Sequence, residues 1–118
     1  MIENKMNDIK ILFAPVHSGD DNYQWVNVEL GSERVGKARI KRQGDTIIIN
    51  NINIFEQYEG RGYATRVLNL FRESADILIA ENVRATARSF WEAMGFYDSR
   101  DGHYRWERRK QGRLKQEG

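Results

Sequence analysis

Cysteine is absent from the 118-residue chain, which excludes disulfide bonds, thiolate nucleophiles and cysteine-ligated zinc. Long apolar runs are absent too, because none approaches the ~20 residues that cross a membrane. The start of the chain, MIENKMNDIK, lacks the apolar core of a signal peptide. A large charge of one sign is also missing, since the formal net charge is +2. We therefore expect a cytoplasmic protein that has no membrane segment and holds no metal.

Enough apolar residues remain to build a core. Hydrophobic residues make up 40% of the chain and include three tryptophans, which suits one globular domain over residues 1–118. The carboxyl-terminal stretch RWERRKQGRLKQEG is locally basic, and we expect residues 110–118 to fray after the last strand. Such a tail is either a solvated end or a phosphate-binding patch. We favour the solvated end and do not expect nucleic acid as a partner.

Residue patterns in the first half of the chain predict strands. Apolar and polar residues alternate there, and short turn sequences with glycine separate the runs. The predicted strands are Ile9–His17, Tyr23–Leu30, Arg34–Arg42 and Thr46–Phe55. The last of them is rich in isoleucine but is interrupted by asparagines in its middle. Consecutive strands joined by short turns predict an antiparallel meander.

The spacing of apolar residues changes after Gly62. A first helical stripe consists of Ala64, Val67, Leu68 and Phe71. A short strand, Ile77–Ala80, follows it. A second helical stripe consists of Ala87, Phe90, Trp91 and Met94. Gly95 is placed to end this helix in the left-handed conformation, and a last hairpin is predicted to turn at Asp101-Gly102.

The segment EGRGYA joins the long strand to the first helix. The first N–H groups of a helix have no partner within it and carry about half a positive charge. A glycine loop leading into a helix can therefore hold an anion with its backbone alone. Gly60 and Gly62 either form such a phosphate cradle or only make the turn. The sequence lacks the Gly-Lys-Ser/Thr of a P-loop and the third glycine of a dinucleotide fold.

This segment resembles the central motif of the GNAT superfamily of N-acetyltransferases. That motif is Gln/Arg-x-x-Gly-x-Gly/Ala at the exit of the fourth strand, and EGRGYA places Gly62 and Ala64 at its two small positions. Glu59 departs from it, since Gln or Arg is expected there. The resemblance implies an α+β fold with a mixed, mostly antiparallel twisted sheet and a CoA site at a central strand, glycine loop and helix.

A second motif supports the resemblance, which covers about Tyr23 to Arg108. The family helix has the form Ala-x-x-Phe-Tyr-x-x-x-Gly-Phe. The matching residues are Ala87, Phe90, Trp91, Gly95 and Phe96, with tryptophan where tyrosine is usual. The two motifs occur at the expected separation and on the expected elements, so together they are more specific than either alone.

The resemblance implies that acetyl-CoA binds at the glycine loop. Its pantetheine arm would lie along the backbone of Ile52 and Ile54. Its pyrophosphate would lie at the start of the helix, on Gly60, Arg61, Gly62, Tyr63, Ala64 and Thr65. The Arg61 guanidinium either bonds a phosphate oxygen or is a solvated loop side chain. Asn82 either contacts the pantetheine amide or caps the helix that follows.

Direct attack of an amine on the thioester requires a polarised carbonyl and a stabilised departing thiolate. In the family a tyrosine commonly protonates the thiolate, and Trp91 stands at that position. Its indole N–H can hydrogen-bond the sulfur but cannot give up a proton, so Trp91 either acts in that way or packs in the core. We expect Tyr97 to replace the tyrosine as the acid, and Tyr104 and Tyr63 are the other candidates. The alternative for each of the three is a purely structural role.

The general base that takes the proton from the amine must also be identified by its expected position. Glu81, which ends the strand ILIA, should stand where the two central strands separate, and we name it first. Glu56 follows, and His103 has a suitable intrinsic pKa but sits at a turn. Each of these residues is otherwise an exposed surface group, and proton loss through water is a further route.

The short link between the first two strands bears on the acceptor. Family members usually carry two helices there, whereas this sequence has only SGDDN. In the family these helices form one wall of the acceptor cleft. The resemblance therefore implies a shallow acceptor site that suits an exposed amine, for example on a protein, unless the second subunit of a homodimer supplies this wall. We expect an N-acetyltransferase that uses acetyl-CoA. The alternatives are a catalytically degenerate acyl-CoA-binding or regulatory module and a nucleic-acid-associated protein that uses the basic tail.

Overall fold

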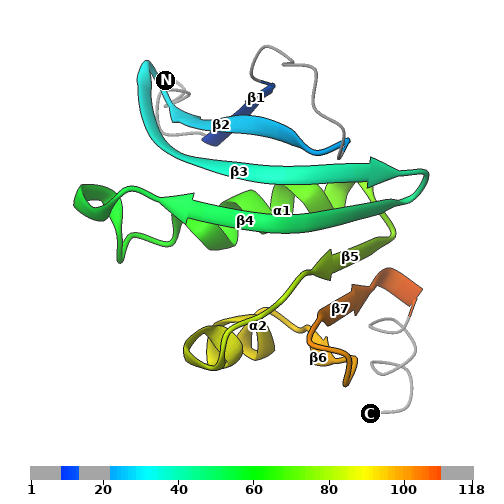
Figure 1. Cartoon of the computed structure of the whole chain (residues 1–118). Helices are drawn as coiled ribbons and strands as arrows, with labels where there is room; N and C mark the ends of the chain where they lie inside the picture. Colours follow the sequence, from blue (N-terminus) through cyan, green and yellow to red (C-terminus); the bar gives the residue numbers. More distant parts are fainter. Residues whose placement is uncertain (1–8, 14–21, 110–118) are drawn as a thin grey trace.

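One mixed sheet organises the part of the chain that the computed structural model describes, residues 9–13 and 22–109 (Figure 1). Its strands lie in the order β1-β2-β3-β4-β5-β7-β6. The strands are β1 Ile9–Phe13, β2 Gln24–Leu30, β3 Glu33–Gln43, β4 Thr46–Ile54, β5 Ile77–Ala80, β6 Tyr97–Asp98 and β7 Tyr104–Glu107. The connecting helices are α1 Tyr63–Ser74 and α2 Arg88–Ala93, with 3-10 turns η2 Glu56–Tyr58 and η3 Ala85–Ala87. Neighbouring strands are antiparallel except β4 and β5, which are parallel. The predicted α+β fold with a mostly antiparallel sheet is confirmed.

The predicted meander of β1 to β4 forms because apolar side chains alternate onto one face. Val26, Ala38 and Ile52 are directly opposite one another across β2, β3 and β4. Val26 and Ala38 have no exposed surface, and Ile52 packs against the same core. Burial of this face is the main stabilising term for the sheet.

A β-bulge at Asn50 explains the asparagines in the middle of β4. Ile49 pairs with Ile40 of β3, whereas Asn51 pairs with Arg39, so Asn50 is the extra residue. Without the bulge, the two-residue alternation would turn the isoleucines after it away from the core. With it, both halves of β4 pack their isoleucines against the same core.

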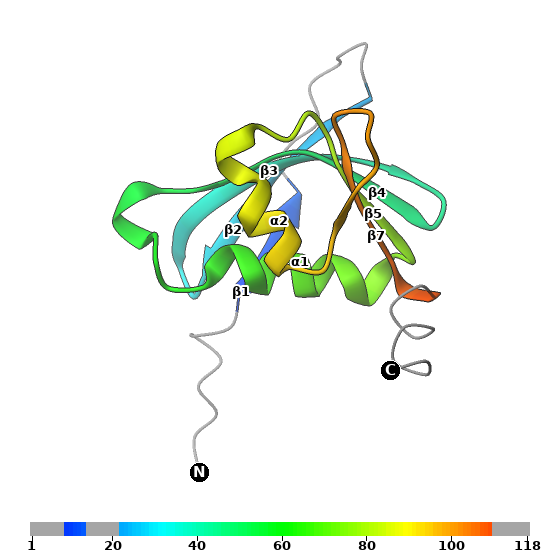
Figure 2. The ribbon, with the colours of Figure 1, turned by 90° about the horizontal axis from the view of Figure 1, so that it is seen from below.

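Both helices cover the same face of the sheet (Figure 2). The buried residues of α1 are Tyr63, Val67, Leu68 and Phe71, and Trp91 is the buried residue of α2. The predicted α1 stripe needs one correction, because Ala64 is only half-buried and Tyr63 is buried instead. The larger ring removes more apolar surface from water. The opposite face carries no helix among the described residues.

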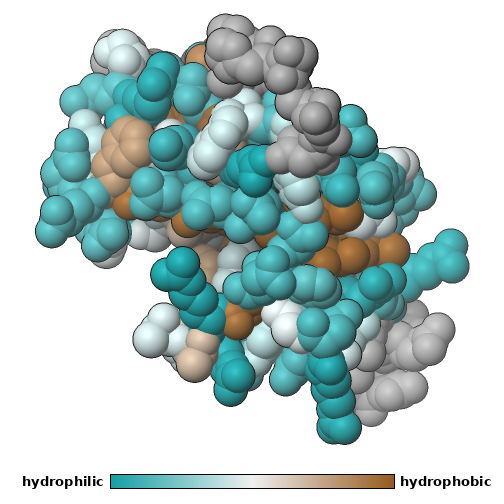
Figure 3. Space-filling model, viewed as in Figure 1, coloured by the Kyte–Doolittle hydropathy of each residue, from teal (hydrophilic) through white to brown (hydrophobic). Residues whose placement is uncertain are grey.

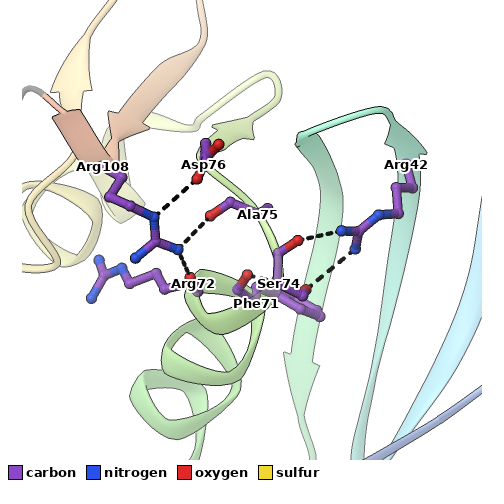
Figure 4. Close-up of polar contacts among 7 residues, drawn as sticks. All are labelled: Arg42, Phe71, Arg72, Ser74, Ala75, Asp76 and Arg108. Carbon is purple, nitrogen blue, oxygen red and sulfur yellow. Dashed lines mark hydrogen bonds and ion pairs between the residues drawn. The ribbon is translucent and has the colours of Figure 1, made fainter.

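The carboxyl end of α1 is fixed to the sheet by two arginines (Figure 4). Arg108 donates to Asp76 Oδ1 at 3.0 Å, to the Ala75 carbonyl at 2.8 Å and to the Arg72 carbonyl. Arg42 of β3 donates to Ser74 Oγ at 3.2 Å and to the Ser74 carbonyl. These bonds satisfy carbonyl groups that a helix end leaves without partners, so α1 is held against the sheet.

The remaining predicted elements agree with the structure where it describes them. Gly95 has φ 90° and ends α2, and β6 and β7 form the expected hairpin. The first strand was predicted to reach His17, but residues 14–17 lie outside the described residues. The predicted basic tail, residues 110–118, lies outside them as well.

Candidate functional site

A cleft of about 510 Å³ opens where β4 and β5 separate. The two strands pair only from Thr46 with Ile77 to Ile49 with Ala80. The last bond runs from the Glu81 N–H to the Ile49 carbonyl at 2.9 Å. The cleft is lined by Ile49, Asn50, Asn51, Ile52, Glu81, Asn82, Val83, Arg84, Ala87 and Trp91. Because β4 continues without a strand neighbour on this side, alternate backbone groups of residues 50–54 face the cleft.

Four of the predicted site residues meet in this cleft, namely Ile52, Glu81, Asn82 and Trp91. Ile54 lies two residues further along β4 and packs against the core without lining the cleft. Asn82 has a left-handed backbone with φ 51°, which turns the chain away from β4. It does not cap a helix, because Arg84 and Ala87 hold the N-cap positions of η3 and α2.

Glu81 is held at the mouth of the cleft by two side chains. The Tyr23 hydroxyl donates to Glu81 Oε1 at 2.5 Å, and the Asn50 amide donates to the same oxygen at 3.4 Å. Arg39 in turn donates to Asn50 Oδ1 at 3.2 Å. The carboxylate is half-buried and fixed in position, so it can accept a proton from a group in the cleft.

The start of α1 has the features of an anion site. Gly62 is the N-cap with φ 80°, no side chain caps the helix, and no acidic residue lies in its first turn. A Cβ atom on Gly60 or Gly62 would meet no atom within 4 Å, so the space in front of the loop is open. The N–H groups of the first turn can therefore approach a phosphate.

The other predicted phosphate residues surround this helix start in different ways. Arg61 is exposed, with its Cζ 5.9 Å from the Tyr58 ring centroid. Tyr63 is buried. The Thr65 hydroxyl lies 3.5 Å from the Met94 sulfur, which brings the helix start next to α2, the helix that carries Trp91 of the cleft. Glu59, which departs from the family motif, is exposed.

Trp91 forms one wall of the cleft and is held by aromatic contacts. Its ring centroid lies 5.1 Å from that of Phe90 and 4.8 Å from that of Phe96, both in edge-to-face arrangements. Its exposed fraction is 9%. These contacts are typical of a packing role.

Tyr97, the predicted replacement acid, lies away from the cleft. It pairs with Arg105 in β7, where Arg105 and Glu107 alternate with the buried Tyr104 and Trp106. Its hydroxyl donates to Glu107 Oε2 at 2.9 Å. Burial, followed by this bond to Glu107, raises the pKa of Tyr97 above the ordinary tyrosine value. The hollow that Tyr97 lines does not include Trp91 or Glu81.

The other candidates for the acid and base are also occupied or distant. His103 Nδ1 accepts the Asn82 N–H at 3.0 Å, and His103 does not line the cleft. Glu56 is exposed in η2 and does not line the cleft. Burial, and then a 3.0 Å hydrogen bond to Glu92, raises the pKa of Tyr104. Glu81 is the carboxylate that the structure brings to the cleft.

The described residues include no group of three histidine or acidic side chains arranged to hold a metal ion. Within residues 9–13 and 22–109, no helix is long and apolar enough to cross a membrane.

Solved structures share this fold. An acetyltransferase from Thermus thermophilus is 24% identical, with a TM-score of 0.62 over 75% of this chain and 66% of that chain. YhhK from E. coli, solved in solution with coenzyme A bound, is 14% identical, with a TM-score of 0.67 over 85% and 98%. The chain has the fold of the GNAT acetyltransferases. A GNAT family acetyltransferase from Elizabethkingia anophelis with acetyl-CoA bound is 10% identical, with a TM-score of 0.60 over 86% and 99%.

No family model and no curated protein matches the sequence. The GNAT fold was nevertheless predicted correctly from two short motifs. Sequence reasoning missed Tyr23, which contacts Glu81, and Asn50, which lies between Glu81 and Arg39. The asparagines of β4 were a signal for Asn50, because a polar interruption in an apolar strand often marks a bulge beside a site. No local pattern pointed to Tyr23.

Proposed function

We propose that this chain is an N-acetyltransferase that uses acetyl-CoA. The observation that carries the proposal is the cleft between β4 and β5, in a GNAT fold, next to a helix start that offers unpaired N–H groups. CoA or acetyl-CoA is bound in solved structures of this fold. A pyrophosphate and a long amide-containing arm need these two kinds of site side by side.

In this proposal the pyrophosphate lies on the backbone of residues 60–65, and Arg61 adds its charge to a phosphate oxygen. The pantetheine arm lies along β4, where the backbone at Ile52 and Ile54 can pair with its amides. Asn82 provides a further polar contact from the opposite wall. The thioester would then reach the mouth of the cleft, where Glu81 is held.

The acceptor amine attacks the thioester carbonyl carbon directly. The nitrogen–carbon bond forms, the carbon–sulfur bond breaks, and CoA leaves as the thiolate. Glu81 takes the proton that the amine must lose, directly or through a water. A thiol has a pKa of about 8.5, so the thiolate can leave without a dedicated acid. We therefore assign no proton transfer to Tyr97, and Trp91 shapes the cleft.

A degenerate acyl-CoA-binding module is the second candidate. The observation that favours it is Trp91, which stands where the family has a tyrosine and which packs between Phe90 and Phe96. This candidate shares the whole donor site with the proposed enzyme. The two differ only in whether an acetyl group is transferred.

The donor site is tested by a substitution at Gly62 with a matched control. Asparagine tolerates the left-handed backbone better than other residues with a side chain, and at Gly62 its side chain would enter the open space in front of the helix start. Gly44 has φ 60° and equally open surroundings in the turn between β3 and β4. We expect Gly62→Asn to weaken acetyl-CoA binding by about tenfold or more and Gly44→Asn to leave it unchanged, as measured by calorimetry. Equal affinity in the two folded variants would contradict the phosphate cradle.

A further inference from the structure

The sheet face without a described helix presents a row of cations beside Glu81. Lys37, Arg39 and Lys41 alternate along β3 with the buried Ala38 and Ile40. Their side chains therefore share the face opposite the helices. This face is turned toward the viewer in Figure 3, where hydrophilic residues cover much of it. We call these three residues the cationic row.

Aromatic rings hold the cationic row in place. Lys37 Nζ lies 4.7 Å from the centroid of the Trp25 ring. Arg39 Cζ and Lys41 Nζ each lie 4.7 Å from the centroid of the Tyr23 ring. Such contacts order the long side chains. Neither lysine forms an ion pair with a carboxylate of the described residues.

The cationic row is connected to Glu81 through Tyr23 and Asn50. Arg39 and Lys41 lie against the Tyr23 ring, and the Tyr23 hydroxyl donates a hydrogen bond to Glu81. Arg39 also reaches Glu81 through Asn50. An acceptor whose amine lies at Glu81 would therefore have the rest of its molecule beside the three positively charged residues of the cationic row. A basic acceptor would be repelled there, and an acidic one attracted.

We propose that the cationic row binds the acceptor as an extended acidic peptide, with carboxylates at alternate positions near the amine that reaches Glu81. This inference rests on the proposed function. Alternate residues of an extended chain repeat every ~6.6 Å, which is also the repeat of the cationic row along β3. The row is flanked by Asn51 and Asn53 of β4, which pair with Arg39 and Lys37. Both asparagines are exposed and can hydrogen-bond a peptide backbone.

The same contacts argue against single-stranded nucleic acid as the occupant. Such strands bind by stacking bases on exposed aromatic faces. Trp25 is 40% exposed, but Lys37 lies over its ring, and two cations lie against the ring of Tyr23. A peptide carboxylate needs only the cations, of which Lys37 is exposed and Arg39 and Lys41 are half-buried.

The binding test uses the full chain without CoA and a labelled peptide with one lysine among alternating glutamates. A peptide with glutamine at each glutamate position is the control. We expect the acidic peptide to bind about tenfold more tightly than the glutamine peptide and to weaken as salt rises. Lys37→Glu and Lys41→Glu should each weaken it by about fivefold. Arg109→Glu makes the same charge change at an exposed residue after β7 and should have no effect.

Folding is checked by circular dichroism, and Lys37→Gln and Lys41→Gln should give smaller losses of the same kind. In the acetylation assay, Lys37→Glu, at a side chain that lies over Trp25 and not over Tyr23, should raise KM for the acidic peptide and leave kcat and the thermal stabilisation by CoA unchanged. Equal affinity for the acidic and glutamine peptides would overturn this inference, and if CoA still binds and amines are acetylated the proposed function stands. Tighter binding of a single-stranded oligonucleotide than of the acidic peptide at one ionic strength would also overturn it. If the protein binds the acidic peptide but does not bind CoA, that result would instead contradict the proposed function.

Discussion

The Tyr23 hydroxyl donates a 2.5 Å hydrogen bond to Glu81 Oε1 across 58 positions of the sequence. Asn50 donates to the same oxygen, which leaves Oε2 to accept a proton. Tyr23 thus fixes the orientation of the carboxylate at the point where β4 and β5 separate. In the proposed reaction it is a positioning residue and not a catalytic one.

Replacing Tyr23 with phenylalanine tests this role. The ring that orders Arg39 and Lys41 is kept and the hydrogen bond is lost, so we expect turnover to fall about tenfold, with acetyl-CoA affinity unchanged and the pH profile of turnover altered. Tyr58→Phe is the matched control, because the Tyr58 hydroxyl donates a 3.1 Å hydrogen bond to Glu33. Neither of these two residues lines the cleft. Equal turnover and pH profiles in the two variants would show that Tyr23 does not act through Glu81.

The packing role of Trp91 predicts different effects for two substitutions. Trp91→Ala should lower the free energy of unfolding by about 3 kcal/mol or more, because a large side chain leaves a cavity between Phe90 and Phe96. Trp91→Phe should keep most of the stability and most of the turnover. Denaturant unfolding and steady-state kinetics measure the two quantities. A collapse of turnover in a stable Trp91→Phe protein would give the indole N–H a role at the sulfur.

Tyr97 predicts a dependence of stability on alkaline pH. Burial and the bond to Glu107 raise the pKa of Tyr97 in the folded state. The stability that it contributes is therefore complete below the unfolded pKa of about 10 and is lost as pH rises through the folded value. Denaturant unfolding should show a shallower loss of stability above pH ~10 in Tyr97→Phe than in the parent protein. Identical alkaline slopes would contradict the raised pKa. Turnover near neutral pH should be little affected, since Tyr97 lies outside the cleft.

Much of the fold follows from local patterns in the sequence. The alternation of β2 and β3, the glycine loop and the helical stripes each depend on residues within one element, so the sequence predicts them. The central part of the site follows as well, because Ile52, Glu81, Asn82 and Trp91 stand at ends or faces of predicted elements that the family arrangement brings together.

The parts that could not be predicted depend on contacts between distant elements. The Tyr23 contact with Glu81 requires β2 and β5 to be placed across the whole width of two other strands. The position of Tyr97 depends on the hairpin register, which pairs it with Arg105 on the face away from the helices. The side chains of the cationic row are held in place by the rings of Tyr23 and Trp25, and residue spacing in the sequence does not predict these contacts.

The most direct test of the central claim is mass spectrometry of an amine-bearing acidic peptide incubated with acetyl-CoA and the protein. We predict the addition of one acetyl group to the amine, with the rate lowered by about 10²-fold in Glu81→Gln and unchanged in Glu56→Gln, an exposed carboxylate outside the cleft. Acetyl-CoA affinity should be the same in all three proteins. A protein that binds acetyl-CoA but adds no acetyl group to this peptide, or to any amine of a cell extract, would contradict the account and identify the chain as a CoA-binding module.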